Sequence, residues 1–237
     1  MSTRRYHTAV ALSSGGTAEI YKAWDSALGR DVALKFLRRD DPALVERMSR
    51  EARAQARLDH PGICQVYEVG ELDGRPFIAM EYVDGFELGV VAPEMHLEDK
   101  LQVVVQVAEA MHHAHQQGLV HRDLKPSNIM VEIRDDGTYR PVVVDFGLVY
   151  ESIDDATAVT HAGQVLGTPP YLAPEQVEGR RDRLDRRTDV YGLGATFYEL
   201  LTGRPPFVGE RTVDLLIQTL RDDPVPPRRL VPSLPTE

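Results

Sequence analysis

The polar and apolar positions in the first third of the chain alternate in short runs, and turn residues separate these runs. A period of two is typical of β-strands, because successive side chains of a strand point to opposite faces. The predicted strands lie near residues 6–12, 19–24, 31–38, 65–70 and 76–82. Residues 72–75, with Asp73 and Gly74 at their centre, fit a tight turn between the last two strands. The N-terminal region is therefore predicted to be an antiparallel sheet.

One helix is predicted between the third and fourth strands, over residues 41–58. Its apolar positions recur every four residues, at Leu44, Met48, Ala52 and Ala56. Glu51 lies three residues after Met48 and therefore shares the inward face. Because a charge on an inward face needs a partner, we expect Glu51 to have a specific counterion.

After residue 85 the apolar spacing becomes helical. A long helix is predicted over residues 97–117, and its inward stripe is made of Leu101, Val104, Val105, Ala108, Met111 and His115. Another is predicted over residues 188–202, before Gly203, and its stripe is made of Val190, Leu193, Phe197, Leu200 and Leu201. The C-terminal part is therefore predicted to be mainly helical.

The segments around these helices are shorter or irregular. A hairpin is predicted from residues 129–133 and 141–144, and a further helix over residues 212–221. Residues 148–174 show no periodicity, and a loop of that length is usually functional. Prolines crowd residues 224–237, so no helix is expected there.

The composition is that of a folded globular protein, because 42% of the 237 residues are hydrophobic and 27% are charged. The formal net charge of −10 argues against a general affinity for nucleic acid or acidic lipid. The single cysteine, Cys64, cannot form an internal disulfide and fits a reducing compartment. The chain shows no secretory apolar segment and no apolar run long enough to cross a bilayer. We therefore expect a cytoplasmic protein that is not inserted in a membrane.

Five sequence elements occur in a fixed order along the chain. VALK covers residues 32–35 and Glu51 follows it; HRDLKPSN, DFG and APE then cover residues 121–128, 145–147 and 173–175. Together they match the protein-kinase signature set in order and approximate spacing. With the phrases EYVDG and GTPPYLAPEQ, they make the chain resemble the eukaryotic-like (Hanks-type) serine/threonine protein kinases of bacteria, over nearly its whole length.

This resemblance implies an α+β, bilobal protein-kinase fold. The N-lobe, an antiparallel sheet plus one helix, is expected at residues 1–83, and the mainly α-helical C-lobe at residues 84–237; together they form one kinase domain. The family continues through further helices after the one at residues 212–221. We therefore expect a C-terminally truncated domain, in which Glu175 lacks the arginine that usually pairs with it.

The same resemblance implies transfer of the γ-phosphate of MgATP to serine or threonine hydroxyls of proteins. Lys35 is similar to the lysine that binds the α and β phosphates, and Glu51 is its expected counterion. Asp123 matches the residue that accepts or orients the proton of the substrate hydroxyl, and Lys125 lies beside the transferred phosphate. These four residues form the expected catalytic set.

Further residues are expected to bind the metal and the nucleotide. Asn128 and Asp145 resemble the family's Mg²⁺ ligands, since both offer hard oxygen donors to a hard cation. The nucleotide-binding residues implied by the resemblance are Gly15 and Gly16 of the glycine-rich loop, Ile20, Ala33, Met80 and Met130 around the adenine, and the backbones of Glu81 and Val83. Of the three glycines in the family pattern only Gly15 remains, because Ser13 and Ala18 replace the others. A Cβ at those two positions is expected to lower nucleotide affinity.

The acceptor class follows from the loop around Lys125, which resembles that of serine/threonine kinases rather than tyrosine kinases. Thr168 is then expected to hydrogen-bond to Asp123 and Lys125. The altered glycine loop supports an alternative, a catalytically impaired pseudokinase or ATP-binding signalling scaffold. A small-molecule kinase is disfavoured by GTPPYLAPE, which forms a platform for the substrate peptide in protein kinases.

The segment between DFG and APE offers Ser152, Thr157 and Thr160 for regulation by phosphorylation. By resemblance to related kinases, Thr160 is the predicted autophosphorylation site, and its phosphate would pair with Arg122. The expected partners are ATP, protein substrates with serine or threonine acceptors, and a second copy of the chain, since a homodimer would allow autophosphorylation.

Two other features have a structural interpretation. His112, His113 and His115 lie on one helix without the paired ligand sets that a metal requires, so they are interpreted as packed or solvent-exposed. Asp189 at the start of an apolar helix is either an N-cap or, by resemblance to the family, the anchor of the catalytic-loop backbone.

Overall fold

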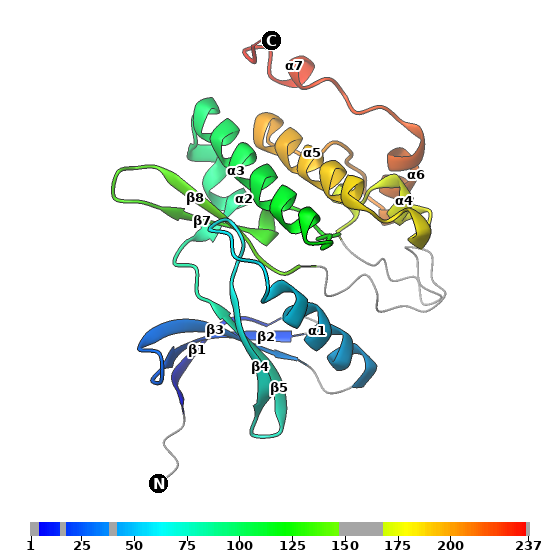
Figure 1. Cartoon of the computed structure of the whole chain (residues 1–237). Helices are drawn as coiled ribbons and strands as arrows, with labels where there is room; N and C mark the ends of the chain where they lie inside the picture. The colour runs from blue at the N-terminus through cyan, green and yellow to red at the C-terminus, as the bar shows by residue number, and fades with distance from the viewer. Residues whose placement is uncertain (1–4, 15–17, 38–41, 147–167, 236–237) are drawn as a thin grey trace. The chain divides into compact units, whose positions relative to one another are not determined.

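The computed structural model describes residues 5–14, 18–37, 42–146 and 168–235 (Figure 1). The chain divides into two compact units, Met1–Asp84 and Gly85–Glu237. Within the described residues, no helix is both long and apolar enough to span a membrane.

The first unit is built on a five-stranded antiparallel sheet. Along the sheet the strand order is β1-β2-β3-β5-β4. The strands are β1 (Tyr6–Ser14), β2 (Ala18–Asp25), β3 (Arg30–Leu37), β4 (Val66–Leu72) and β5 (Arg75–Glu81). All five predicted strands are present, and their ends agree with the prediction within two residues.

The predicted turn between β4 and β5 is confirmed. Leu72 pairs with Arg75, and the two residues between them, Asp73 and Gly74, have φ angles of 50° and 73°. Two successive residues in the left-handed region form the turn whose twist matches that of the strands in a hairpin.

One face of this sheet carries a hydrophobic core. Val32 and Leu34 of β3 are 0% and 1% exposed, and they pack with buried residues of β2 and β5. Phe77 lies edge-on to Tyr6 at a centroid distance of 5.5 Å and is 6.1 Å from the ring of Phe36. The core therefore joins strands that are distant in sequence.

Helix α1 (Pro42–Gln55) packs against β4 and β5. Met48 and Ala52 are each 1% exposed, as the four-residue spacing predicts. The prediction was wrong for Ala56, because the helix ends at Gln55 and Ala56 is exposed. The Gln55 side chain donates a hydrogen bond of 2.8 Å to the carbonyl oxygen of Cys64, which ties the helix end to the approach to β4.

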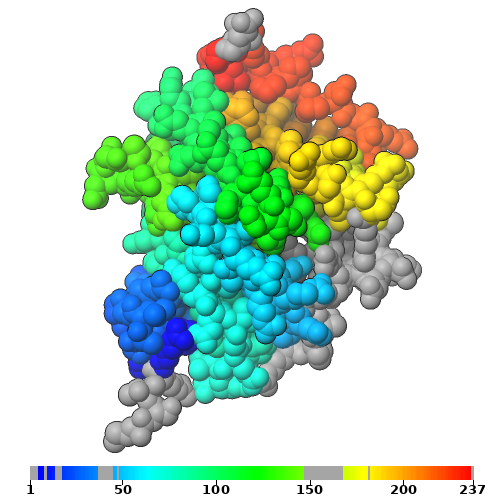
Figure 2. All heavy atoms as spheres, in the orientation of Figure 1, coloured from blue at the N-terminus to red at the C-terminus, as the bar shows by residue number. Residues whose placement is uncertain are grey.

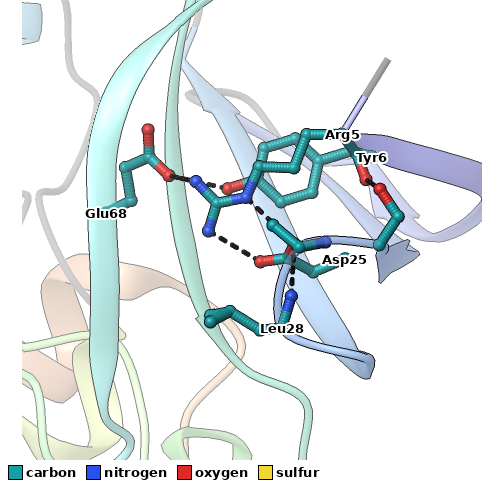
Figure 3. A network of polar contacts seen from close by, with 7 residues as sticks. Arg5, Tyr6, Asp25, Leu28 and Glu68 are labelled. Atoms are coloured by element: carbon teal, nitrogen blue, oxygen red, sulfur yellow. Dashed lines mark hydrogen bonds and ion pairs between the residues drawn. The ribbon is translucent and has the colours of Figure 1, made fainter. Parts of the chain in front are cut away.

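A polar network joins the start of β1 to the end of β2 and to β4 (Figure 3). The guanidinium of Arg5 contacts both carboxylate oxygens of Asp25, at 2.9 and 2.7 Å, and also Oε2 of Glu68. The Tyr6 hydroxyl donates to the same Glu68 oxygen at 2.9 Å. Burial and the neighbouring Glu68 carboxylate raise the pKa of Tyr6, so its hydroxyl stays a donor at neutral pH.

The second unit combines helices with a small sheet of order β6-β7-β8. The strands are β6 (Phe86–Glu87), β7 (Ile129–Ile133) and β8 (Tyr139–Val143). The α-helices are α2 (Leu88–Val91), α3 (Leu97–Gln116), α4 (Pro174–Val177), α5 (Arg186–Thr202), α6 (Thr212–Arg221) and α7 (Pro227–Leu230), and the short 3-10 helices are η1 (Ala92–Glu94), η2 (Pro126–Asn128), η3 (Pro169–Tyr171) and η4 (Arg181–Arg183). The predicted hairpin and the predicted helices at residues 97–117, 188–202 and 212–221 are confirmed.

The predicted inward face of α3 was wrong at Leu101, Val105 and Ala108, which are exposed, and right at Met111, which is 3% exposed. Its buried residues are Val103, Val107, Ala110, Met111 and Ala114, whereas Leu101 and Val105 are 44% and 56% exposed. Both faces of this helix are apolar, so the spacing alone does not choose between them. The face that is used carries Ala110 and Ala114, and α3 packs against α5 and β8.

The inward face of α5 agrees with the prediction at Leu200, which is 4% exposed, but differs from it near the start of the helix. Val190 is 65% exposed, while Asp189 and Gly192 are buried. A Cβ on Gly192 would lie 2.8 Å from the carbonyl oxygen of Leu124, so this glycine allows the chain around residue 124 to touch the helix. The buried face of α5 therefore includes a polar anchor and a close backbone approach as well as apolar side chains.

The expectation that residues 224–237 contain no helix was wrong. Residues Pro227–Leu230 form one helical turn, α7. Proline is tolerated in the first turn of a helix, where its missing N–H has no intrahelical partner to lose.

Candidate active site

The loop that follows α3 is held in a strained conformation by a buried carboxylate. Arg122 has a φ of 66°, a region that side chains with a Cβ rarely adopt. The backbone N–H groups of His121 and Arg122 donate to Oδ2 and Oδ1 of Asp189, at 2.8 and 2.7 Å. Asp189 is 2% exposed and lies on α5, whose N-cap is Asp185. Asp189 is therefore the anchor of this loop rather than a helix cap.

His121 joins the same loop to the chain after β8. Its imidazole is fully buried, accepts a hydrogen bond from the N–H of Asp123 at Nδ1, and contacts the Val144 carbonyl oxygen through Nε2 at 2.9 Å. The ring also lies 4.8 Å from that of Phe146. Asp145, which lies between Val144 and Phe146, has a φ of 58°. The His121 ring thus fixes the backbone on both sides of the candidate site.

Four polar side chains converge beside this histidine. Asp123 Oδ2 accepts hydrogen bonds from Lys125 Nζ at 2.7 Å and from the amide nitrogen of Asn128 at 3.1 Å. Lys125 Nζ also donates to the hydroxyl of Thr168 at 2.6 Å, which is the contact expected between these two residues. The ammonium group therefore links Asp123 to Thr168. An aspartate held by a lysine and an amide can accept a proton from a hydroxyl placed next to it.

A buried glutamine connects this group to the segment after Thr168. The Gln176 side chain donates to the carbonyl oxygen of Arg122 at 2.7 Å and accepts from the N–H of Ala173 at 2.9 Å. Gln176 is 2% exposed. Sequence reasoning missed its role, although its position directly after the APE motif was the available signal.

Two further contacts hold this segment against α5. The Glu175 carboxylate accepts a hydrogen bond from the Thr188 hydroxyl at 2.7 Å. This carboxylate, for which the sequence predicts no arginine partner, thus has an uncharged donor. The Tyr171 hydroxyl donates to the Glu199 carboxylate. Burial and that carboxylate raise the pKa of Tyr171.

The oxygen donors predicted for Mg²⁺ come from Asn128 and Asp145. The amide nitrogen of Asn128 also donates to the backbone carbonyl oxygen of Asp123 at 2.7 Å, which leaves the amide oxygen to meet a cation. One carboxylate and one amide oxygen, together with phosphate oxygens and water, form the kind of ligand set that Mg²⁺ takes beside a nucleotide. These residues therefore fit the metal. In the described part of the chain, no cluster of three or more His, Cys, Asp or Glu residues forms a separate metal site.

The residues predicted to bind the nucleotide in the first unit share one face of its sheet. Lys35 pairs with Ile20 on one side and Ile78 on the other, and Ala33 pairs directly with Met80. Paired and alternate residues of a sheet project to the same face, so this face lies opposite the hydrophobic core. Lys35 is only 5% exposed. An apolar surface with one buried lysine suits an adenine ring followed by phosphates.

The remaining predicted residues are placed as follows. Glu51 is half-buried on α1, and its pairing with Lys35 stays a prediction. The N–H of Glu81 donates to the carbonyl oxygen of Gln65 at 2.8 Å, and Val83 is 7% exposed. Met130, in the second unit, pairs with Val142 across β7 and β8. Gly15 and Gly16 lie outside the described residues.

Comparison with known proteins establishes the family. The model of the protein kinase domain matches residues 6–227, so the chain belongs to the protein kinase domain family. This confirms the resemblance predicted from the motifs.

The chain resembles several bacterial kinases. It is 42% identical over 233 residues to "Serine/threonine-protein kinase PknB" of Mycobacterium leprae, covering 94% of this chain and 36% of that protein. It is 40% identical over 243 residues to "Probable serine/threonine-protein kinase SCO3848" of Streptomyces coelicolor, covering 98% of this chain and 35% of that protein. The chain thus spans about a third of the length of these relatives.

Among solved structures, the chain resembles the crystal structure of the Mycobacterium tuberculosis PknI kinase domain. The TM-score is 0.70 and the identity 29%, with 99% of this chain and 85% of that one covered. This likeness confirms the predicted α+β protein-kinase fold.

Proposed function

We propose that this chain is an ATP-dependent protein kinase that transfers the γ-phosphate of ATP to serine or threonine hydroxyls of proteins. The observation that carries the proposal is the group of Asp123, Lys125 and Thr168, joined by hydrogen bonds of 2.7 and 2.6 Å. The family membership and the names of the relatives support the same activity.

In this proposal each site residue of the second unit has one role. The acceptor hydroxyl lies beside Asp123, which takes its proton as the oxygen bonds to the γ-phosphorus. The bond between that phosphorus and the β–γ bridging oxygen breaks, and ADP leaves. Lys125 neutralises the charge that develops on the transferred group. Asp189 and His121 keep the loop in place, so the carboxylate needs no rearrangement during the reaction.

The metal and the first unit would position the nucleotide. Asn128 and Asp145 would hold Mg²⁺, which neutralises phosphate charge when it is bound. Lys35 would bind the α and β phosphates and Glu51 would pair with Lys35. Ile20, Ala33 and Met80 would cover the adenine.

An acceptor comparison tests the proposal. The chain is incubated with radiolabelled ATP, Mg²⁺ and matched peptides whose single acceptor is serine, threonine or tyrosine, and with small hydroxylated metabolites. We expect label in the serine and threonine peptides only. Label confined to small molecules would contradict the proposal.

One observation favours a second candidate, an ATP-binding scaffold without transfer. Two of the three glycines of the phosphate-binding pattern are replaced, by Ser13 and Ala18. Nucleotide binding in the absence of any labelled acceptor would favour this candidate. The intact set of Lys35, Asp123, Asn128 and Asp145 supports the active enzyme instead.

The proposal extends to regulation and location. Thr160, which lies outside the described residues, is the proposed site of autophosphorylation by a second copy of the chain. Phosphopeptide mapping of active protein that leaves Thr160 unmodified would contradict this. The buried, unpaired thiol of Cys64 suits the reducing cytoplasm, where we propose that the domain acts.

A further inference from the structure

Residues 178–187, here called the arginine segment, concentrate positive charge in an acidic protein. They contain five arginines and three acidic residues, whereas the whole chain has a net charge of −10. Four of the five arginine side chains are exposed: Arg180, Arg183, Arg186 and Arg187. The fifth, Arg181, has a side chain outside the described set. Figure 2 shows this part of the chain, in yellow, on the visible surface.

The acidic residues of the arginine segment do not neutralise it. Arg180 pairs with Glu178 at 2.9 Å, and Arg187 lies 3.9 Å from Asp185; both pairs are exposed, so water and salt weaken them. Asp185 is also occupied as the N-cap of α5, where it accepts the N–H of Arg187. Arg183 and Arg186 form no ion pair with any residue that the structure describes.

The placement of the arginines does not serve the stability of the fold. Arg186 and Arg187 are the first two residues of α5. The start of a helix carries a partial positive charge, so cations there are unfavourable and acids are preferred. Arginines placed where they disfavour the helix indicate that these side chains serve binding rather than stability.

Residues just outside each end of the arginine segment hydrogen-bond to the backbone of Arg122, the residue before Asp123. On one side, Gln176 donates to the carbonyl oxygen of Arg122 at 2.7 Å. On the other side, Asp189 accepts the N–H of the same Arg122 at 2.7 Å. The N–H of Arg180 also donates to the carbonyl oxygen of Glu175 at 2.9 Å. The exposed arginines therefore emerge within a few residues of contacts with the catalytic loop.

We propose that the arginine segment docks an acidic stretch of the protein substrate, with Arg183 and Arg186 as its main contacts. This inference rests on the proposed function and adds the substrate class: a peptide with aspartate or glutamate near its serine or threonine. Planar guanidinium groups bind carboxylates through paired hydrogen bonds. Arg183 and Arg186 have no ion pair among the described residues to give up when the substrate binds.

The test uses the whole chain and three threonine peptides that differ only in flanking charge: acidic, neutral and basic. The double variant Arg183→Gln, Arg186→Gln is compared with the wild type and with Arg228→Gln, Arg229→Gln, which removes two exposed arginines from α7 in the same unit. We expect the first double variant to raise KM for the acidic peptide about fivefold, leaving kcat and the KM for the neutral peptide unchanged. The α7 variant should behave as the wild type, and added salt should remove the preference for the acidic peptide.

A binding measurement separates this proposal from the proposed function. Fluorescence anisotropy of labelled acidic peptide, without ATP, reports docking even if no peptide is phosphorylated. Weaker binding by the Arg183, Arg186 double variant alone supports the docking surface. Equal binding by all three proteins, or equal loss in both double variants, would overturn it, and absence of transfer to every peptide would count against the kinase activity only.

Discussion

His115 on α3 and Asp189 on α5 are joined by a hydrogen bond of 2.7 Å between Nε2 and Oδ2. Their side chains are 12% and 1% exposed, and the same Asp189 oxygen accepts the backbone N–H of His121. Because a carboxylate only accepts, the imidazole nitrogen donates. The carboxylate that anchors the loop at His121 and Arg122 is thus itself held by a side chain of the neighbouring helix α3. The sequence pattern alone predicts only a packed or exposed side chain at His115.

Replacing His115 by phenylalanine should weaken both stability and turnover. The buried carboxylate of Asp189 loses one of three donors, and a hydrogen bond to a charged group contributes about 1.5–3 kcal/mol. We expect a decrease of that size in the free energy of unfolding, and a lower kcat with little change in KM for ATP.

The matched control is His112→Phe, an exposed position on the same helix. Urea denaturation and steady-state kinetics measure both variants. If the His115 variant equals the His112 variant in both readouts, the contact with Asp189 has no role in positioning the loop.

Two glycines of α5 allow a matched test of the contact with the loop around Leu124. A Cβ at Gly192 would meet the carbonyl oxygen of Leu124 at 2.8 Å, whereas a Cβ at Gly194 would meet nothing within 4 Å. Gly192→Ala should therefore destabilise the protein and lower kcat. Gly194→Ala should stabilise it by up to about 1 kcal/mol, since alanine is the better helix former. Thermal unfolding decides, and the reverse order would contradict the close approach of helix and loop.

The link between Lys125 and Thr168 predicts a difference between two conservative substitutions. Thr168→Ser keeps the hydroxyl that accepts from Lys125 at 2.6 Å, whereas Thr168→Val keeps the shape and removes it. Loss of a hydrogen bond to a charged group corresponds to about a tenfold to hundredfold decrease in kcat. The serine variant should retain most of the activity. Equal kcat values for the two variants would show that the hydroxyl does not position Lys125.

The pairing of Arg5 with Asp25 predicts a pH-dependent contribution to stability. Hydrogen bonds from Arg5 lower the pKa of Asp25 below its ordinary value. A lowered folded-state pKa means that the stabilisation is present above the unfolded-state pKa, about 4, and is lost as the pH falls below it. Asp25→Asn should therefore cost about 1–3 kcal/mol at pH 7 and much less in acid.

The control for this effect is Asp31→Asn, because Asp31 pairs with Lys22 at the surface and is 41% exposed. Urea titrations at several pH values measure all three proteins. A difference between wild type and Asp25→Asn that stays constant down to acid pH would contradict the role of the Asp25 charge.

The strands and helices could be predicted from the sequence because their patterns are local. The turn at Asp73 and Gly74 and the end of α5 at Gly203, with a φ of 75°, follow from the backbone freedom of glycine and of short polar residues. The inward faces of α3 and α5 could not be predicted in the same way. They depend on what packs against each helix, and both helices carry apolar side chains on more than one face.

The same distinction between local patterns and distant contacts applies to the candidate site. Asp123, Lys125 and Asn128 could be predicted, because they lie within one contiguous motif. His115 contacts Asp189 and Gln176 contacts Arg122, and in both cases the partner is distant in sequence. A local sequence pattern cannot predict such contacts.

The most direct test of the central claim is phosphate transfer by the wild-type chain and by Asp123→Asn, measured with radiolabelled ATP and a threonine peptide, alongside ATP binding by each protein. Asparagine keeps the size of Asp123 and an acceptor for Lys125, but it cannot take the proton of the acceptor hydroxyl. We predict transfer by the wild type, a decrease of about a hundredfold or more in the variant, and nearly equal affinity for ATP in both. Undiminished turnover by the variant would contradict the account, as would a wild-type chain that binds ATP and labels no acceptor.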